Sequence, residues 1–232
     1  MSEWINTFFF GIYPYIALSV FLIGSVIRFD REQYTWRSQS SQLLRRRQLV
    51  WGSILFHVGI LIILFGHVGG LLTPVFLFEM VGISHTAKQL TAIIVGGTAG
   101  IVCLIGLLML LHRRLSDPRI RKTSGPSDIA ILLLLLAQLL LGLSTIIVSL
   151  NHLDGGEMIS LMTWAQYIVT LRPGAANFVA DVSPFFKAHL FLGLTIFLVF
   201  PFTRLVHIFS APIWYLGRRG YQIVRTRRLG KA

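Results

Sequence analysis

The sequence predicts an all-α membrane protein, a bundle of five transmembrane helices that forms a single domain over residues 1–232. The chain has a mean hydropathy of +0.72 and only 13% charged residues, which leaves too little polar surface for a soluble protein of this size. A helix needs about 20 apolar residues to cross the hydrocarbon layer, because that layer is about 30 Å thick and each residue rises about 1.5 Å. Five segments meet this requirement, at approximately residues 6–27, 49–72, 90–111, 129–150 and 188–210.

Several of these segments have distinctive sequence features. The first leads into the charged flank RFDREQYTWR instead of a small-residue cleavage site, so we interpret it as a retained span and not as a signal peptide. The third contains Cys103, the only cysteine, which excludes a disulfide framework and is interpreted as a small packing residue. The fourth reads IAILLLLLAQLLLGLSTIIVSL and is almost continuously apolar. Before the fifth, MISLMTWAQYIVTL predicts a short helix along the membrane interface, with Trp164 at headgroup depth.

Basic residues alternate between the two sides of the predicted bundle. They cluster after the first, third and fifth spans, whereas the other two connections hold only Lys88, Arg172 and Lys187. Because Lys and Arg in short loops favour the cytoplasmic side, we expect the N-terminus outside and the C-terminus in the cytoplasm. The net charge of +12 then reflects topology and attraction to anionic lipid headgroups. It does not indicate nucleic acid, since the basic residues lie at membrane edges.

Four of the seven histidines lie inside predicted spans, where polar groups are costly and usually mark a site. His57 and His67 lie in the second span, and His189 and His207 lie in the fifth. These two spans run in opposite directions, so the topology pairs His57 with His207 near the inner end and His67 with His189 further out. The other three lie in loops or at span ends, where a solvated imidazole needs no special role: His85, His112 and His152.

The spacing of the four histidines limits how well the pairs fit. In a straight helix, His189 and His207 are five full turns apart and lie about 27 Å from each other along the axis. His57 and His67 are only about 15 Å apart and are rotated by about 80° from a shared face. With two straight helices the two separations therefore disagree by about 12 Å.

Facing pairs of imidazoles in an apolar bundle favour a b-type haem that is ligated on both faces of its iron. Such a haem has no open coordination position, so it carries electrons and does not activate a substrate. Zinc fits poorly because neither pair has further Cys, Asp or Glu ligands at its depth, and no C-x-x-C-H motif is present for covalent haem attachment. A buried histidine can alternatively serve as a hydrogen bonder between helices. Three arginines near the inner end are candidate partners of the haem propionates: Arg113, Arg114 and Arg204.

Long stretches of the chain resemble one family. They include FFFGIYPYIALSVFLIGSVIRFDREQYTWRSQSSQ, LFHVGILIILFGHVGGLLTP, RRLSDPRIR, NHLDGGEM and FFKAHLFLGLTIFLVFPFTRLVHIFSAP. Through them the chain resembles, over nearly its whole length, the gamma or cytochrome b subunit of bacterial membrane-bound respiratory nitrate reductase. The resemblance implies five spans and two b haems. It also implies that His57 and His207 ligate the proximal, inner haem and that His67 and His189 ligate the distal, outer haem.

The same resemblance implies a quinol site on the outer side, beside the distal haem. The lysine of that site is matched here by Lys88 in HTAKQL. A lysine near the interface can donate a hydrogen bond to a quinone oxygen, whereas the plainer interpretation is a lysine that extends to the headgroups. Gly66, next to His67, would allow the quinol ring to approach closely.

The resemblance also implies a mechanism and partners. Menaquinol or ubiquinol would be oxidised near the outer face of the bacterial cytoplasmic (inner) membrane and release protons there. Electrons would cross inward through both haems to an iron–sulfur beta subunit and a molybdenum-containing alpha subunit that reduces nitrate. The chain has no motif for either cofactor of those partners, and its basic loops, especially Arg45–Arg47, together with the basic tail, are candidate docking surfaces.

Two alternatives remain open at the level of sequence. One is a related cytochrome b of another quinone-linked oxidoreductase, such as a heterodisulfide-reductase-like complex. The other is a haem-free transporter in which the intramembrane histidines relay protons. Against the transporter, no acidic residue lies in the interior of any span, and signals for broken helices are sparse.

Overall fold

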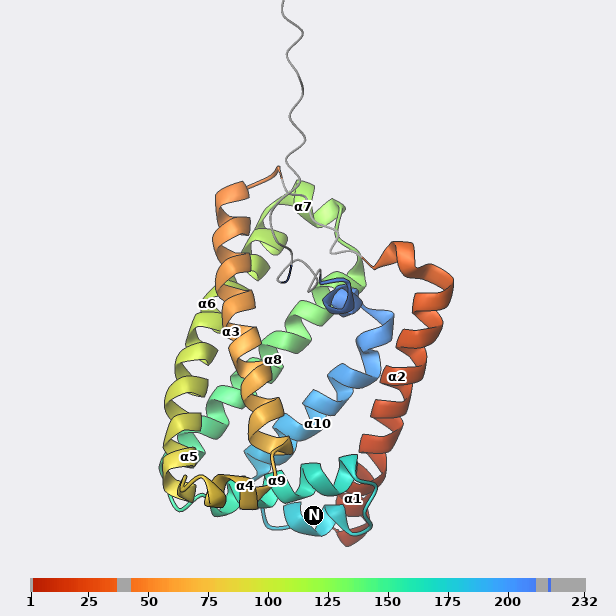
Figure 1. The fold of residues 1–232 in the computed structure, drawn as a ribbon. Coiled ribbons are helices and arrows are strands. Elements are labelled where there is room, and N and C mark those ends of the chain that lie inside the picture. The colour runs from red at the N-terminus through yellow and green to blue at the C-terminus, as the bar shows by residue number, and fades with distance from the viewer. Residues whose placement is uncertain (1, 37–42, 212–216, 218–232) are drawn as a thin grey trace, which may run out of the picture.

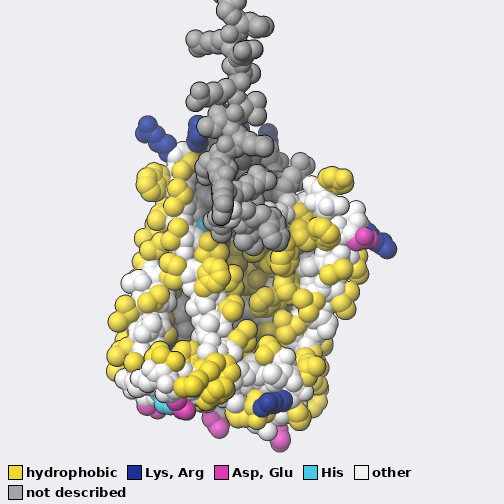
Figure 2. Space-filling model, viewed as in Figure 1, with side chains coloured by type: hydrophobic (Ala, Val, Ile, Leu, Met, Phe, Trp, Pro, Cys, Tyr) yellow, Lys and Arg dark blue, Asp and Glu magenta, His cyan; other side chains and the backbone are white. Residues whose placement is uncertain are grey.

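The computed structural model describes residues 2–36, 43–211 and 217, and the regular structure of these residues is entirely helical. Five helices in this part of the chain are long and apolar enough to cross a membrane, which confirms the predicted five-helix bundle. Hydrophobic side chains cover the flank of the bundle, and charged side chains gather at its two ends (Figure 2). The five helical stretches are Glu3–Thr35, Arg46–Leu72, His85–Ser116, Pro126–Leu150 and Pro184–Phe202.

The first of these stretches consists of α1 (Glu3–Thr7), a π-helical turn η1 (Phe8–Ile12), α2 (Tyr13–Glu32) and η2 (Gln33–Thr35). The wide π turn comes directly before Pro14, which has no backbone N–H to continue the α-helical pattern. The remaining elements are α3 (Arg46–Leu72), α4 (Val75–Met80), α5 (His85–Thr91), η3 (Ala92–Gly96), α6 (Gly97–Ser116), α7 (Pro118–Lys122), α8 (Pro126–Leu150), α9 (Gly156–Val169), η4 (Ala175–Val179), α10 (Pro184–Val199), η5 (Phe200–Phe202) and η6 (Arg204–Ser210).

The long helices alternate in direction between two ends, which we call the α7 end and the α9 end (Figure 1). Packed neighbours follow the order α2, α10, α8, α6 and α3, so that α3 and α2 stand at the two margins of the array. α3 and α10 run in opposite directions, as the topology predicts. Which end faces the cytoplasm stays a prediction, and the basic tail at residues 218–231 lies outside the described residues.

The tightest contact of the bundle joins α3 to α6 through small residues. A Cβ atom on Gly59 of α3 would lie 2.7 Å from the Ala99 carbonyl oxygen, and one on Gly106 of α6 would lie 2.8 Å from the Gly52 carbonyl oxygen. Cys103 is fully buried in this contact, in agreement with its predicted packing role. Small residues allow two backbones to approach closely where lipid provides no hydrophobic drive for association. This contact fixes the position of α3.

The α9 end is closed by α9 and η4, which pack on the start of the first helix. The predicted short helix before the fifth span is present as α9, and the headgroup depth of Trp164 stays a prediction, but its side chain packs inside the protein. Trp164 is only 5% exposed, and its indole N–H donates to the Phe10 carbonyl oxygen at 2.8 Å. The carbonyls next to the π turn and Pro14 need hydrogen-bond partners, and Trp164 supplies one from a segment far away in the sequence.

The predicted continuous helix over residues 188–210 is also wrong. α10 ends at Val199, the 3₁₀ turn η5 follows, and Thr203 is extended (φ −117°, ψ 177°) before η6 begins. Pro201 explains the interruption, because it cannot donate the backbone hydrogen bond to the residue four positions earlier and its ring clashes with that residue's carbonyl. The chain therefore turns before it reaches His207.

Side chains from other helices hold this interruption in place. Arg28 of α2 donates to the carbonyl oxygens of Pro201 (2.6 Å) and Thr203 (2.8 Å), which satisfies acceptors that the broken helix leaves without partners. Asp128, in the first turn of α8, forms ion pairs with Arg204 (3.5 Å) and with Arg114 of α6 (3.4 Å). The segment from Pro201 to Arg204 is thus attached directly to α2 and α8, and Asp128 links it further to α6.

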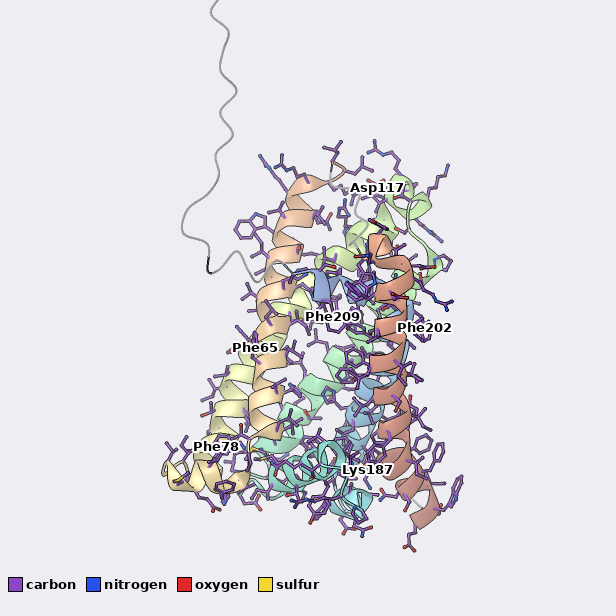
Figure 3. The ribbon with its side chains drawn as sticks, turned by 45° about the vertical axis from the view of Figure 1, so that its right-hand side comes forward. Phe65, Phe78, Asp117, Lys187, Phe202 and Phe209 are labelled. Carbon is purple, nitrogen blue, oxygen red and sulfur yellow. The ribbon has the colours of Figure 1, made fainter. Side chains whose placement is uncertain are left out.

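A second ion cluster at the α7 end is centred on Asp117 (Figure 3). Its buried carboxylate caps the first turn of α7 and lies 3.5 Å from Arg45 and 3.7 Å from Arg119. Burial alone would raise the pKa of Asp117, but backbone N–H groups of Arg119 and Ile120 and the charges of Arg119 and Arg45 hold that pKa below its usual value. Arg45 has a positive φ of 44° at the start of α3, and this ion pair holds it there.

The α3–α6 contact predicts the effect of one added methyl group. Gly106→Ala forces the two backbones apart and should destabilise the protein by roughly 1–3 kcal/mol, which lowers its unfolding temperature in detergent by several degrees. Gly69→Ala is the matched control, because no atom lies within 4 Å of its added Cβ, so this variant should be at least as stable as the parent. Equal stability of the two variants would contradict the role assigned to the contact.

Candidate functional site

The four histidines of the predicted spans meet in two pairs between α3 and the fifth span. His57 of α3 faces His207 of η6, with ring centres 6.4 Å apart and ring planes at 76°. His67 of α3 faces His189 of α10, with ring centres 6.0 Å apart and ring planes at 42°. The structure thus brings together the same partners as the predicted topology. The turn after Val199 removes the disagreement of about 12 Å that straight helices would give, because His207 does not lie on a continuation of α10.

The other three histidines lie at the ends of helices and have local partners. His85 is 3.6 Å from the Glu79 carboxylate, His112 Nδ1 is 3.0 Å from the Gln48 amide nitrogen, and His152 Nδ1 is 3.2 Å from the Val148 carbonyl oxygen. None of these three is placed against a second imidazole in the described residues.

Three of the four paired imidazoles are oriented by the backbone of their own helix. His57 Nδ1 lies 2.7 Å from the Ser53 carbonyl oxygen, His67 Nδ1 lies 2.8 Å from that of Ile63, and His207 Nδ1 lies 2.6 Å from that of Arg204. A carbonyl oxygen only accepts, so each Nδ1 carries the proton and donates it. The Nε2 atom of each ring is then left with a free lone pair, which is the usual state of a metal-ligating histidine.

His189 is the exception. Its Nδ1 is buried without a hydrogen-bond partner in the described residues, and its Nε2 lies 3.4 Å from the amide nitrogen of Gln138 on α8. That amide also donates to the His189 carbonyl oxygen at 3.1 Å. Gly142, one turn further along α8, makes room for the ring, because a Cβ there would lie 3.0 Å from its Cε1.

Sequence reasoning missed Gln138 and Gly142. A signal for Gln138 was present, since it is the one amide in the leucine-rich fourth span, and a polar group at that depth calls for a partner. Gly142 had no comparable signal, because its importance depends on which residue of α10 lies opposite.

The donor set of each pair fits a haem iron. Two imidazoles that bind one metal ion from opposite sides, with bonds of about 2 Å, have ring centres roughly 6 Å apart. The described residues contain no group of three or more His, Cys, Asp or Glu side chains that could hold a metal ion alone. Two protein ligands are sufficient where a macrocycle supplies the remaining ones. The face of the bundle is hollowed between α3 and α2 (Figure 2). The His57 and His67 side chains are exposed.

The three predicted propionate partners all lie at the α7 end, but each has protein partners of its own. Arg113 donates to the Leu44 carbonyl oxygen at 2.8 Å. Arg114 and Arg204 share the carboxylate of Asp128. The Arg204 carbonyl accepts from His207, so this residue positions one imidazole through its backbone. A contact with a propionate stays a prediction for all three.

Lys88 lies on α5, near the α9 end and beside the same segment of α3 as His67. Its ammonium group donates to the Gly70 carbonyl oxygen at 3.1 Å, lies 2.7 Å from Met162 Sδ and stands 3.6 Å from the centre of the Phe78 ring. Phe78 is labelled at this end in Figure 3. Gly66 is one helical turn before Gly70, and no atom lies within 4 Å of a Cβ built on it. Lys88, Gly66 and the His67–His189 pair are therefore grouped at one end of α3.

Comparison with known proteins places the chain in a family. The sequence profile described as "Nitrate reductase gamma subunit" matches residues 6–227. The chain is 52% identical over 228 residues to the Respiratory nitrate reductase 2 gamma chain of Escherichia coli (strain K12), which covers 98% of this chain and 100% of that protein. It is 51% identical over 225 residues to the Respiratory nitrate reductase 1 gamma chain of the same organism, which covers 97% and 99%. It is 42% identical over 217 residues to the Nitrate reductase gamma chain of Bacillus subtilis (strain 168), which covers 94% and 96%. The chain belongs to the nitrate reductase gamma subunit family.

Proposed function

We propose that this chain is the cytochrome b subunit of a respiratory nitrate reductase, which oxidises a quinol at the α9 end and delivers the electrons to partner subunits at the α7 end. The observation that carries the proposal is the pair of cross-helix imidazole contacts, His57 with His207 and His67 with His189, at two depths of one apolar bundle. The names of the related gamma chains support nitrate as the acceptor of the whole complex.

In this proposal each imidazole pair holds one b-type haem. His57 and His207 hold the proximal haem, and His67 and His189 hold the distal haem. When bound, the haems supply reversible one-electron carriers between the two ends of the bundle. The protein fixes the tautomers of three of the four imidazoles through backbone carbonyls.

Lys88 and Gly66 would form the quinol site beside the His67–His189 pair. The Lys88 ammonium group exchanges its contact with the Gly70 carbonyl for a hydrogen bond to a quinol oxygen, and this contact favours the deprotonation that accompanies oxidation. Gly66 allows the quinol ring to lie close to α3, since no atom lies within 4 Å of a Cβ built on this glycine. Either menaquinol or ubiquinol fits this chemistry.

The orientation of the bundle follows from its basic residues. With the α7 end in the cytoplasm of a bacterial cell, the α9 end releases protons on the outer face of the inner membrane. Electrons then move inward, so that the reaction builds a membrane potential. Arg46 and Arg47 at the start of α3 are exposed and available to dock an iron–sulfur beta subunit and a molybdenum-containing alpha subunit.

Single histidine replacements test the haem assignment. The intact chain should contain two haems b, measured as pyridine haemochrome per purified complex. His57→Ala and His207→Ala should each remove the same haem, and His67→Ala and His189→Ala should each remove the other, because loss of either axial ligand breaks the pair. The control is His152→Ala, which should keep both.

The optical difference spectra of the two variants of a pair should coincide, while the two pairs should differ from each other. A wild-type complex without haem b would reject the proposal in favour of a proton relay. Loss of the same haem by His57→Ala and His67→Ala would reject the pairing.

Lys88→Ala tests the quinol site. Quinol-dependent nitrate reduction should fall about ten- to a hundredfold, as expected for the loss of one hydrogen bond to a charged group that contributes about 1.5–3 kcal/mol. Haem content should not change, and nitrate reduction by an artificial donor that reduces the partner subunits directly should persist. Lys187→Ala is the matched control, because this lysine lies at the same end but donates to the Ala180 carbonyl of its own segment. Equal losses in both variants would argue against a specific role of Lys88.

A further inference from the structure

The four paired imidazoles differ in what holds the ring nitrogen that faces away from the partner. His57, His67 and His207 each donate to a carbonyl of their own helical segment, three or four residues earlier. The ring of His189 instead leans across to α8 and lies against Gly142, so its own helix provides no acceptor. The distal pair thus contains the only one of the four imidazoles that depends on a side chain of another helix for its polar contacts.

Two buried polar atoms at this place have no hydrogen-bond partner in the described residues, and they are complementary. One is His189 Nδ1, and the other is Gln138 Oε1. A histidine that binds a metal through Nε2 carries its proton on Nδ1 and needs an acceptor for it. Gln138 Oε1 is an acceptor, and the side chain already contacts His189, because its amide nitrogen donates to the His189 carbonyl at 3.1 Å and lies 3.4 Å from His189 Nε2. A metal bound at Nε2 would replace the second of these contacts and leave the carboxamide oxygen available to the Nδ1–H group. Unpaired polar groups at membrane depth cost free energy, so each of the two atoms favours the other as its partner.

We propose that Gln138 is a positioning residue for the distal haem ligand, and that its carboxamide holds the His189 ring as backbone carbonyls hold the other three. The inference rests on the proposed function, since it concerns the imidazole pair His67 and His189. Gly193 supports it on the other side, because a Cβ there would lie 3.1 Å from the Gln138 amide nitrogen and would push the side chain away from His189. Gly142 and Gly193 thus leave a space in which one amide reaches the imidazole from α8.

This arrangement has a chemical consequence for the distal pair alone. An acceptor on Nδ1–H increases electron donation from the imidazole to the metal and stabilises the oxidised form. For the proximal pair the acceptors are backbone carbonyls, which no substitution removes. In the distal pair His67 also donates to a backbone carbonyl, but a side chain would supply the acceptor for His189. Removal of that side chain should therefore raise the midpoint potential of the distal haem and leave the other unchanged.

The test uses the purified complete complex with Gln138→Leu, Gln138→Glu and the control Ser144→Ala. Ser144 lies six residues further along α8, and its hydroxyl donates to the Leu140 carbonyl of the same helix. Redox titration followed by optical spectroscopy gives both haem potentials, and electron paramagnetic resonance of the oxidised complex reports the ligand field of each haem. The His67→Ala and His57→Ala variants identify which signal belongs to which pair.

We expect Gln138→Leu to shift the distal potential upward, or to lose the distal haem, while the proximal haem keeps its potential and its resonance signal. Gln138→Glu keeps an acceptor oxygen and should retain the distal haem, with a potential at or below that of the wild type. Ser144→Ala should change neither haem. Unchanged distal signals in Gln138→Leu, equal shifts of both haems, or loss of the distal haem in both Gln138 variants would overturn the inference. A wild-type complex without two haems would instead reject the proposed function itself.

Discussion

The arrangement of the bundle depends on the end of α10 at Val199. A helix that continued to Ser210 would place His207 about 27 Å along the axis from His189. The imidazoles that face these two histidines, on α3, are only about 15 Å apart along their helix. Pro201 ends the helix, and the following turn returns the chain toward α3. Arg28 satisfies the carbonyls that this turn exposes, and Asp128 attaches η6 to α8 through Arg204. The irregular segment is therefore fixed at both of its ends.

The two imidazole pairs also depend on the position of α3, because this helix carries one imidazole of each pair. Its position is set by backbone contacts with α6 at Gly59 and Gly106, which bring the two helices close enough that even a methyl group does not fit. Further along α3, no atom lies within 4 Å of a Cβ built on Gly66, Gly69 or Gly70. Glycines of the same helix thus have two different purposes, close packing against α6 around Gly59 and clearance near His67 further along the helix.

Much of this architecture could be predicted from the sequence. The five spans follow from apolar length, and the pairing of His57 with His207 and of His67 with His189 follows from the alternation of basic loops, because charge and hydropathy act locally along the chain. The end of α10 was missed although Pro201 was visible, since transmembrane helices often tolerate proline. The burial of Trp164 and the contact of Gln138 with His189 could not be predicted, because each depends on which distant segment packs opposite. The partners of Arg114 and Arg204 were missed for the same reason, as Asp128 joins them only in three dimensions.

The contrast between an unbroken α3 and an interrupted fifth span implies different tolerance to changes in chain length. One residue inserted between His57 and His67 would rotate every later side chain of α3 by about 100° and move His67 off its face. The spacing and relative orientation of His57 and His67 are therefore fixed by one continuous helix. Between His189 and His207 the turn at Thr203 separates two helical pieces, so a change in length there can be absorbed by the turn without rotating both imidazoles together. Variation in length among related chains should accordingly concentrate in the fifth span and spare the eleven residues from His57 to His67.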